Sequence, residues 1–141
     1  MRKRHIKITA TAESDYLADV ALAANFAELL GRARTADEEF RQAQATAAPA
    51  SEQYARARAL DTALTDATRA AYAAQRAEIG PRGYDDRIYR RKAMATPGVH
   101  RWTDEAERLL TLRETHRLTG FPARPEAAAL GLEVARMPAD N

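Results

Sequence analysis

Alanine and larger apolar residues recur at helical spacing from about residue 13. The stripe that starts at Tyr16 and Leu17 predicts a helix over residues 13–47. Gly31 interrupts the stripe, so we expect a break or kink near residues 31–35.

A second helix is predicted between Pro49 and the pair Gly80–Pro81. Residues 52–79 contain neither glycine nor proline. One stripe of positions follows the helical repeat: Tyr54, Ala57, Leu60, Leu64, Ala67, Ala71 and Ala74. Glycine after the last turn, followed by proline, ends a helix. The two helices are therefore expected to form a long antiparallel hairpin over residues 13–80.

A small C-terminal cap of two helices is predicted over residues 103–137. Thr103 is the expected N-cap of the first helix, and Gly120 ends it. Pro125 opens the second helix, which runs to about Arg136. We expect both helices to pack around Trp102 and the leucines from Leu109 to Leu118, with a polar tail at residues 138–141.

Residues 1–12 are expected to form a basic arm or strand. In HIKITAT, Ile6, Ile8 and Ala10 alternate with polar residues, which is typical of a strand. An extended arm is an equal possibility, with Thr11 or Ser14 as the cap of the helix that comes next. The fold class expected from the whole pattern is mainly α, with this one possible strand.

The composition favours thin helices with little bulk. The chain has 141 residues, of which 33 are alanine, while Leu, Ile, Val and Phe together number 22, about 16%. A net charge of only +2 argues against disorder. Alanine is the best helix former but buries little apolar area. We therefore expect the protein to need a partner or self-association to bury enough surface.

Basic residues are concentrated in two segments. Residues 1–10 carry four cations and no acid. Residues 81–102, broken by glycines and prolines, are expected to be an irregular basic connection with only a short helix over about 84–95. Within it, RIYRRKAMATPGVHRW has no acid and holds two aromatic residues, Tyr89 and Trp102.

Two interpretations of this basic stretch stay open. It could neutralise phosphates and stack its aromatic rings on exposed bases. Alternatively, its cations pair with Asp85, Asp86 or the acids of residues 103–107, and Trp102 anchors the core. The candidate contacts to nucleic acid or a partner are Arg2, Lys3, Arg4, Lys7, Arg87, Tyr89, Arg90, Arg91, Lys92 and Arg101.

Nothing in the sequence assembles a catalytic or metal site. His5, His100 and His116 are widely spaced, so we expect them to be solvated or, for His116, to lie at a helix C-terminus. The chain has no cysteine, phosphate-binding glycine loop or nucleophile elbow. We expect no enzyme, cofactor or metal. A groove-reading C-terminal helix is also disfavoured, because Glu126 and Glu133 would face phosphates.

The leading hypothesis is a non-enzymatic helical interaction or assembly protein that docks to itself or to a larger partner. A component of a phage or mobile-element complex would fit. The alternative is a nucleic-acid-binding protein that contacts phosphates through residues 1–7 and 87–102. No apolar run suits a secretion signal or a membrane span. We therefore expect a cytoplasmic protein, or a virion-associated one if it is phage-encoded, with no membrane contact.

Overall fold

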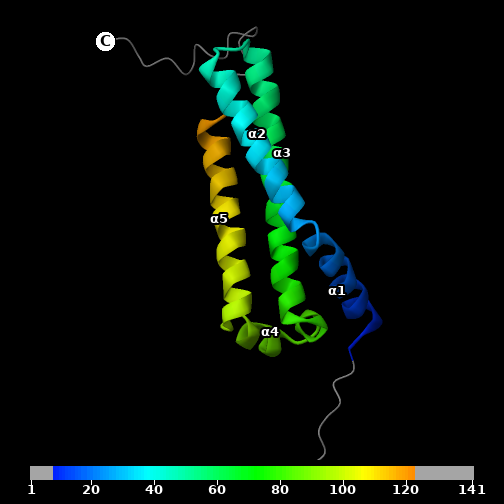
Figure 1. Ribbon diagram of the computed structural model, residues 1–141. Helices are drawn as coiled ribbons and strands as arrows, with labels where there is room; N and C mark the ends of the chain where they lie inside the picture. The colour runs from blue at the N-terminus through cyan, green and yellow to red at the C-terminus, as the bar shows by residue number, and fades with distance from the viewer. Residues whose placement is uncertain (1–7, 123–141) are drawn as a thin grey trace, which may run out of the picture.

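A computed structural model describes residues 8–122 of the chain, and it is helical almost throughout (Figure 1). The elements are α1 (Ala10–Ala23), α2 (Phe26–Ala45), α3 (Ala50–Ile79), the 3-10 helix η1 (Pro81–Tyr84), α4 (Arg87–Ala93) and α5 (Pro97–Thr119). No strand occurs within the described residues. The expected mainly α fold is confirmed, whereas the arm before Ile8, the predicted last helix and the tail lie outside the described residues.

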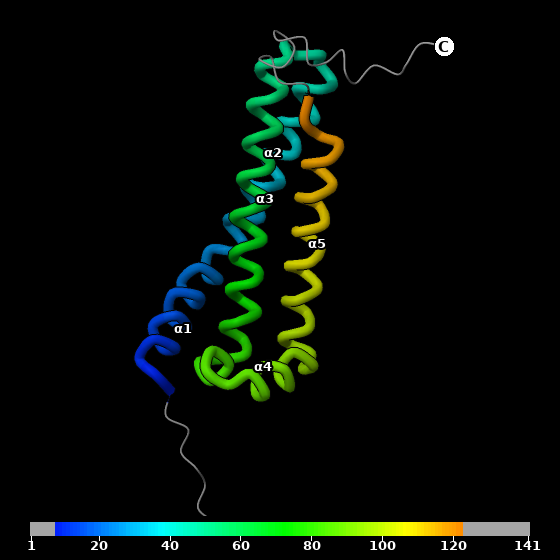
Figure 2. Tube along the Cα trace, turned by 180° about the vertical axis from the view of Figure 1, so that it is seen from behind, coloured from blue at the N-terminus to red at the C-terminus, as the bar shows by residue number. Residues whose placement is uncertain are grey.

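The antiparallel hairpin is present, formed by α2 and α3 around a short turn (Figure 1). The predicted position of the break before it is wrong. The chain turns at Ala24–Asn25, and Gly31 lies inside α2, on its exposed side. A glycine costs a helix only about 1 kcal/mol, so α2 continues through it. The turn at Ala24–Asn25 lets α1 diverge from the line of α2 (Figure 2).

The start of α1 corrects the predicted strand. Ile8 and Thr9 precede the helix, and Ala10 is already its first residue. Thr9, not Thr11 or Ser14, is the N-cap, and its hydroxyl oxygen accepts a hydrogen bond from the backbone N–H of Ala12 at 3.1 Å. A capping side chain that satisfies a free helical N–H favours the helix over an extended strand here.

Helix α3 is the centre of the bundle, and α1, α2 and α5 all pack on it. The predicted stripe is confirmed: its members are buried except Tyr54, which is half-buried. Ala67, Ala70, Ala71 and Ala73 are all 0% exposed. These small side chains let α1, α2 and α5 approach α3 closely. Gly80 then ends α3 with a φ of 96°, a conformation that glycine adopts without strain.

The predicted start of the first C-terminal helix is wrong, whereas its end at Gly120 is confirmed. Helix α5 begins at Pro97, not Thr103, and lies along α3 as a third long helix (Figure 1). The reason is that Pro97 suits the first turn of a helix, and inside α5 the Thr103 hydroxyl donates to the Val99 carbonyl at 3.1 Å. Of the expected apolar face, Leu109 is buried but Leu112 and Leu118 are 46% and 85% exposed.

Two further side chains of α5 make contacts far along the chain. Trp102 is half-buried and packs against the core, as expected, with its ring edge-on to that of Phe26 and the centroids 5.1 Å apart. His116 lies in the last turn of α5, as expected, and it is buried there, with its ring against Phe40 and Phe121. Both residues join α5 to other parts of the chain, which local spacing does not reveal.

Candidate phosphate-binding face

The basic stretch folds into α4, a short helix held across the lower end of the bundle in Figure 1. Gly80 and Pro81 turn the chain into η1. Asp86 then caps α4, because its carboxylate accepts a hydrogen bond from the backbone N–H of Tyr89 at 2.9 Å. This bond, with the Arg82 guanidinium nearby, holds the pKa of the Asp86 carboxyl below its usual value. The expected short helix is confirmed, and a side-chain cap fixes its start.

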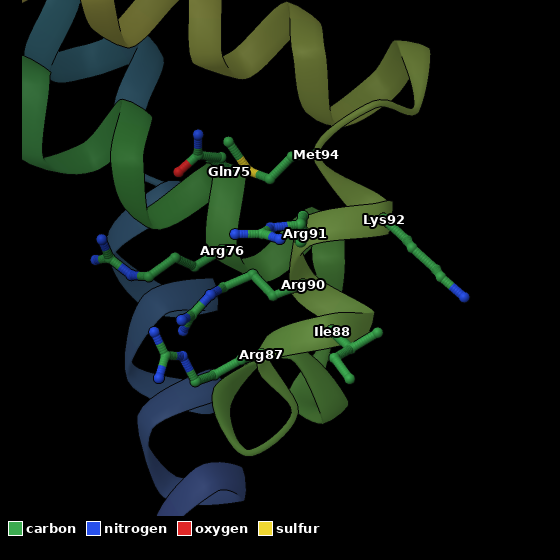
Figure 3. A pocket seen from close by; sticks show the side chains of 8 residues that line it. All are labelled: Gln75, Arg76, Arg87, Ile88, Arg90, Arg91, Lys92 and Met94. Carbon is green, nitrogen blue, oxygen red and sulfur yellow. The ribbon is translucent and has the colours of Figure 1, made fainter.

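Three arginines share one face of α4. Arg87, Arg90 and Arg91 stand three and four residues apart, so their side chains are neighbours on the helix surface. Figure 3 shows these side chains extending toward the side where Arg76 of α3 lies, whereas Lys92 extends away from it. We call Arg76, Arg87, Arg90 and Arg91 the basic face.

The basic face borders an open hollow of about 730 Å³. Its lining residues are Gln75, Arg76, Arg87, Ile88, Arg90, Arg91, Lys92 and Met94. Five of these eight side chains are cationic and none is acidic. Such a surface attracts anions, because the fields of several like charges add up in one place.

Arg76 is the one member of the basic face that forms an ion pair within residues 8–122. Its guanidinium donates to both carboxylate oxygens of Asp19 on α1, at 2.8 and 3.0 Å. The hydroxyl of Tyr84 donates to the same carboxylate. Burial raises the pKa of Asp19, but the hydrogen bonds from Arg76 and Tyr84 outweigh it and leave this pKa below its ordinary value. Asp19 therefore stays charged and joins α1 to α3 and η1.

Arg87, Arg90 and Arg91 form no ion pair with any acid of the described residues. Arg90 makes only a long contact to a backbone oxygen, that of Gly83, at 3.5 Å. Lys92 and Arg101, both exposed, also have no acidic partner in this part of the chain. Arg101 lies on α5 and does not line the hollow, so the structure does not bring it together with the others.

The acids expected to neutralise this stretch have other partners. Asp85 accepts hydrogen bonds from the backbone N–H and the hydroxyl of Thr9, at 3.1 and 3.0 Å. Asp86 caps α4 and pairs with Arg82. In the first half of α5, Asp104 pairs with His100 and Glu105 with Arg108. Within residues 8–122, none of these four acids forms an ion pair with Arg87, Arg90, Arg91, Lys92 or Arg101.

The two aromatic rings of the stretch are engaged within the fold. The guanidinium carbon of Arg82 lies 4.5 Å from the centre of the Tyr89 ring, which is the geometry of a cation–π contact. Trp102 packs on Phe26. Neither ring is presented as a free stacking platform beside the basic face.

Sequence reasoning missed Arg76, because it stands on another helix, before the turn that leads into the basic stretch. A signal was present: Arg76 occupies the last turn of α3, directly before the Gly80–Pro81 turn that returns the chain. The four candidates Arg2, Lys3, Arg4 and Lys7 lie outside the described residues.

Other kinds of site find little support in the described part of the chain. No cluster of three His, Asp or Glu side chains within residues 8–122 could hold a metal ion. No helix in that range has the length and apolarity needed to cross a membrane. Comparison with protein-family models, curated proteins and solved structures finds no match to this chain.

Proposed function

We propose that this protein is a non-enzymatic nucleic-acid-binding protein that contacts phosphates through α4. The observation that carries the proposal is the set of three neighbouring arginines, Arg87, Arg90 and Arg91, which have no acidic partner in residues 8–122 while the nearby acids have other partners. Guanidinium groups donate forked hydrogen bonds that match phosphate oxygens. Lys92, which lines the same hollow, is a further candidate contact.

The engaged aromatic rings support contact with the backbone of the nucleic acid more than with its bases. Stacking proteins present exposed rings to bases, and Tyr89 and Trp102 are both packed in the fold. Phosphate contacts fix a protein on nucleic acid without reading its sequence. The proposed binding is therefore electrostatic and independent of sequence.

Fluorescence anisotropy with a labelled 20-base-pair duplex at several salt concentrations tests the proposal. Each lost phosphate contact lowers the slope of log affinity against log salt by about 0.9. The triple variant Arg87→Ala, Arg90→Ala and Arg91→Ala should bind more weakly, with a slope smaller by about 2 to 3.

A matched control removes three exposed arginines away from α4, by Arg34→Ala, Arg58→Ala and Arg69→Ala. It changes the net charge by the same amount, so it should retain most of the slope if the basic face is the contact surface. Equal loss in both triple variants, or no binding by the unchanged protein, would reject the assignment.

A second candidate function is that of an interaction or assembly protein. The supporting observation is α1, which packs mainly on α3 and η1 and leaves Leu17 and Val20 exposed at 58% and 40% on one side. These two residues are three positions apart and so lie together on the helix surface. The expectation of a phage or mobile-element origin stays a prediction.

Light scattering coupled to size exclusion tests self-association through α1. The protein should exceed its monomer mass of 15.6 kDa as its concentration rises. Leu17→Glu combined with Val20→Glu should return it to a monomer, whereas Leu118→Glu, at another exposed leucine, should not. A monomer at every concentration would count against this function.

A further inference from the structure

An apolar groove runs between α2 and α5, on the side of α3 that they both flank. The two helices pack on α3 and scarcely on each other. The space between them measures about 500 Å³, and its floor and walls include Phe40, Leu60, Leu64, Leu109 and Leu112. Leu112, one of these lining residues, is 46% exposed.

The directions of α2, α3 and α5 match those of three helices in a four-helix bundle. Helices α2 and α5 run the same way, and α3 runs against both (Figure 1). A further helix lying in the groove and running against α2 and α5 would complete an up-down-up-down bundle.

The chain leaves α5 at one end of this groove. Thr119 and Gly120 are among the groove's lining residues. Phe121 then packs against Tyr54 and His116, with ring centroids 5.8 and 5.0 Å apart. The chain beyond Phe121 therefore starts beside the end of the groove.

The C-terminal sequence has the pattern of the missing helix. Ala127, Leu130, Val134 and Met137 recur at spacings of three and four, which places them on one face of a helix. Thirteen helical residues, 125–137, would span about 20 Å at 1.5 Å per residue. The groove extends along α2 from Leu30 to Gln44, which by the same rise is about 22 Å.

The border of the groove carries more basic than acidic groups. Arg34, Arg41 and Arg108 line it with the single acid Asp37. Arg41 pairs with Asp37 and Arg108 pairs with Glu105. In a helix over residues 125–137, Glu126 and Glu133 would lie seven residues apart along one edge of the apolar face, next to such a basic border.

We infer that residues 125–137 dock as a fourth helix in the groove between α2 and α5 and cover Leu60, Leu64, Leu109 and Leu112. Gly120–Arg124 is then a five-residue connection, an ordinary length between antiparallel helices. This inference does not depend on the proposed nucleic-acid contact, which lies on α4.

Thermal unfolding of the full chain tests the inference with a matched pair of variants. Leu130→Asp places a charge on the docked face and should lower the Tm by about 5 to 10 °C. Leu132→Asp places the same charge on the opposite face, since two residues turn a helix by about 200°. It should change the Tm by less than about 2 °C. Equal effects of both variants, or no effect of either, would overturn the inference.

Introduced pairs of cysteines test which segment occupies the groove. The chain has no cysteine of its own, so only the introduced pair can form a disulfide. Leu112→Cys with Leu130→Cys should form a disulfide within one chain under mild oxidation, at a rate independent of protein concentration. Leu118→Cys, which is exposed and does not line the groove, should not pair with Leu130→Cys. Disulfide-linked dimers in place of the intramolecular product would show that a second copy occupies the groove and would overturn the inference.

Discussion

The imidazole of His116 on α5 donates a hydrogen bond from Nε2 to the carbonyl oxygen of Ala57 on α3, at 2.8 Å. A carbonyl oxygen can only accept, so this contact places the hydrogen on Nε2. The ring also lies edge-on against Phe40, with the centroids 5.1 Å apart. One buried polar side chain thus joins three helices near the end of the bundle that lies opposite α4.

Removing this ring should destabilise the bundle. His116→Ala loses a hydrogen bond and leaves a cavity beside Phe40, so the free energy of unfolding should fall by about 2 to 4 kcal/mol. Urea denaturation measures it. His100→Ala is the control, because the His100 side chain is 63% exposed, and it should cost less than about 0.5 kcal/mol. If both variants lower the free energy of unfolding by similar amounts, the burial of His116 does not stabilise the bundle.

Thr65 and Thr68 of α3 make a matched pair. The hydroxyl of Thr65 is buried with no hydrogen-bond partner in residues 8–122, whereas that of Thr68 donates to the Leu64 carbonyl at 2.6 Å. An unsatisfied buried hydroxyl is costly, so Thr65→Val should raise the free energy of unfolding by about 1 kcal/mol. Thr68→Val should lower it by about 1 kcal/mol. Urea denaturation of both variants tests this, and the reverse order would contradict it.

The ion pair between Asp19 and Arg76 should make stability depend on acid. The pKa of Asp19 in the folded protein lies below its ordinary value of 3.8, so its contribution is complete above that value. It is lost as the pH falls through the lower, folded pKa. Asp19→Asn should therefore unfold more easily than the unchanged protein at pH 7, and the difference should shrink by pH 3.

Urea titrations at both pH values measure this difference. Asp66→Asn is the control, because Asp66 has no hydrogen bond or ion pair within the described residues, and it should change stability little at either pH. A gap between Asp19→Asn and the unchanged protein that stays constant from pH 7 to pH 3 would contradict the assigned role of the carboxylate.

Local patterns predict the features of this fold that depend on neighbouring residues. The buried stripe of α3 and its end at Gly80 result from spacing and from the conformational freedom of glycine. The turn at Ala24–Asn25 contains no glycine or proline, so local patterns do not mark it. Directly after it, Phe26 packs on Trp102, far along the chain. Tertiary packing overrides a local helix breaker such as Gly31.

The same division explains what could be predicted of the basic face. The run of cations in residues 87–92 is visible in the sequence, and so is the capping position of Asp86. The sequence does not show which acids are free to neutralise these cations. Asp85, for example, is bound by Thr9, which stands 76 residues earlier in the chain. Arg76 joins the face only because the Gly80–Pro81 turn folds α4 back beside the end of α3.

If phosphates rather than bases are contacted, Tyr89 should be dispensable for binding. Its ring is covered on one side by Arg82, so Tyr89→Leu should leave the affinity for nucleic acid within about twofold, whereas loss of a stacking ring costs about 1 to 3 kcal/mol per base. A duplex, which carries more charge per length than a single strand, should bind more tightly. Anisotropy titrations with a labelled 20-base-pair duplex and with its single strand measure both effects. Tighter binding of the single strand, together with a large loss in Tyr89→Leu, would show that the ring stacks on bases.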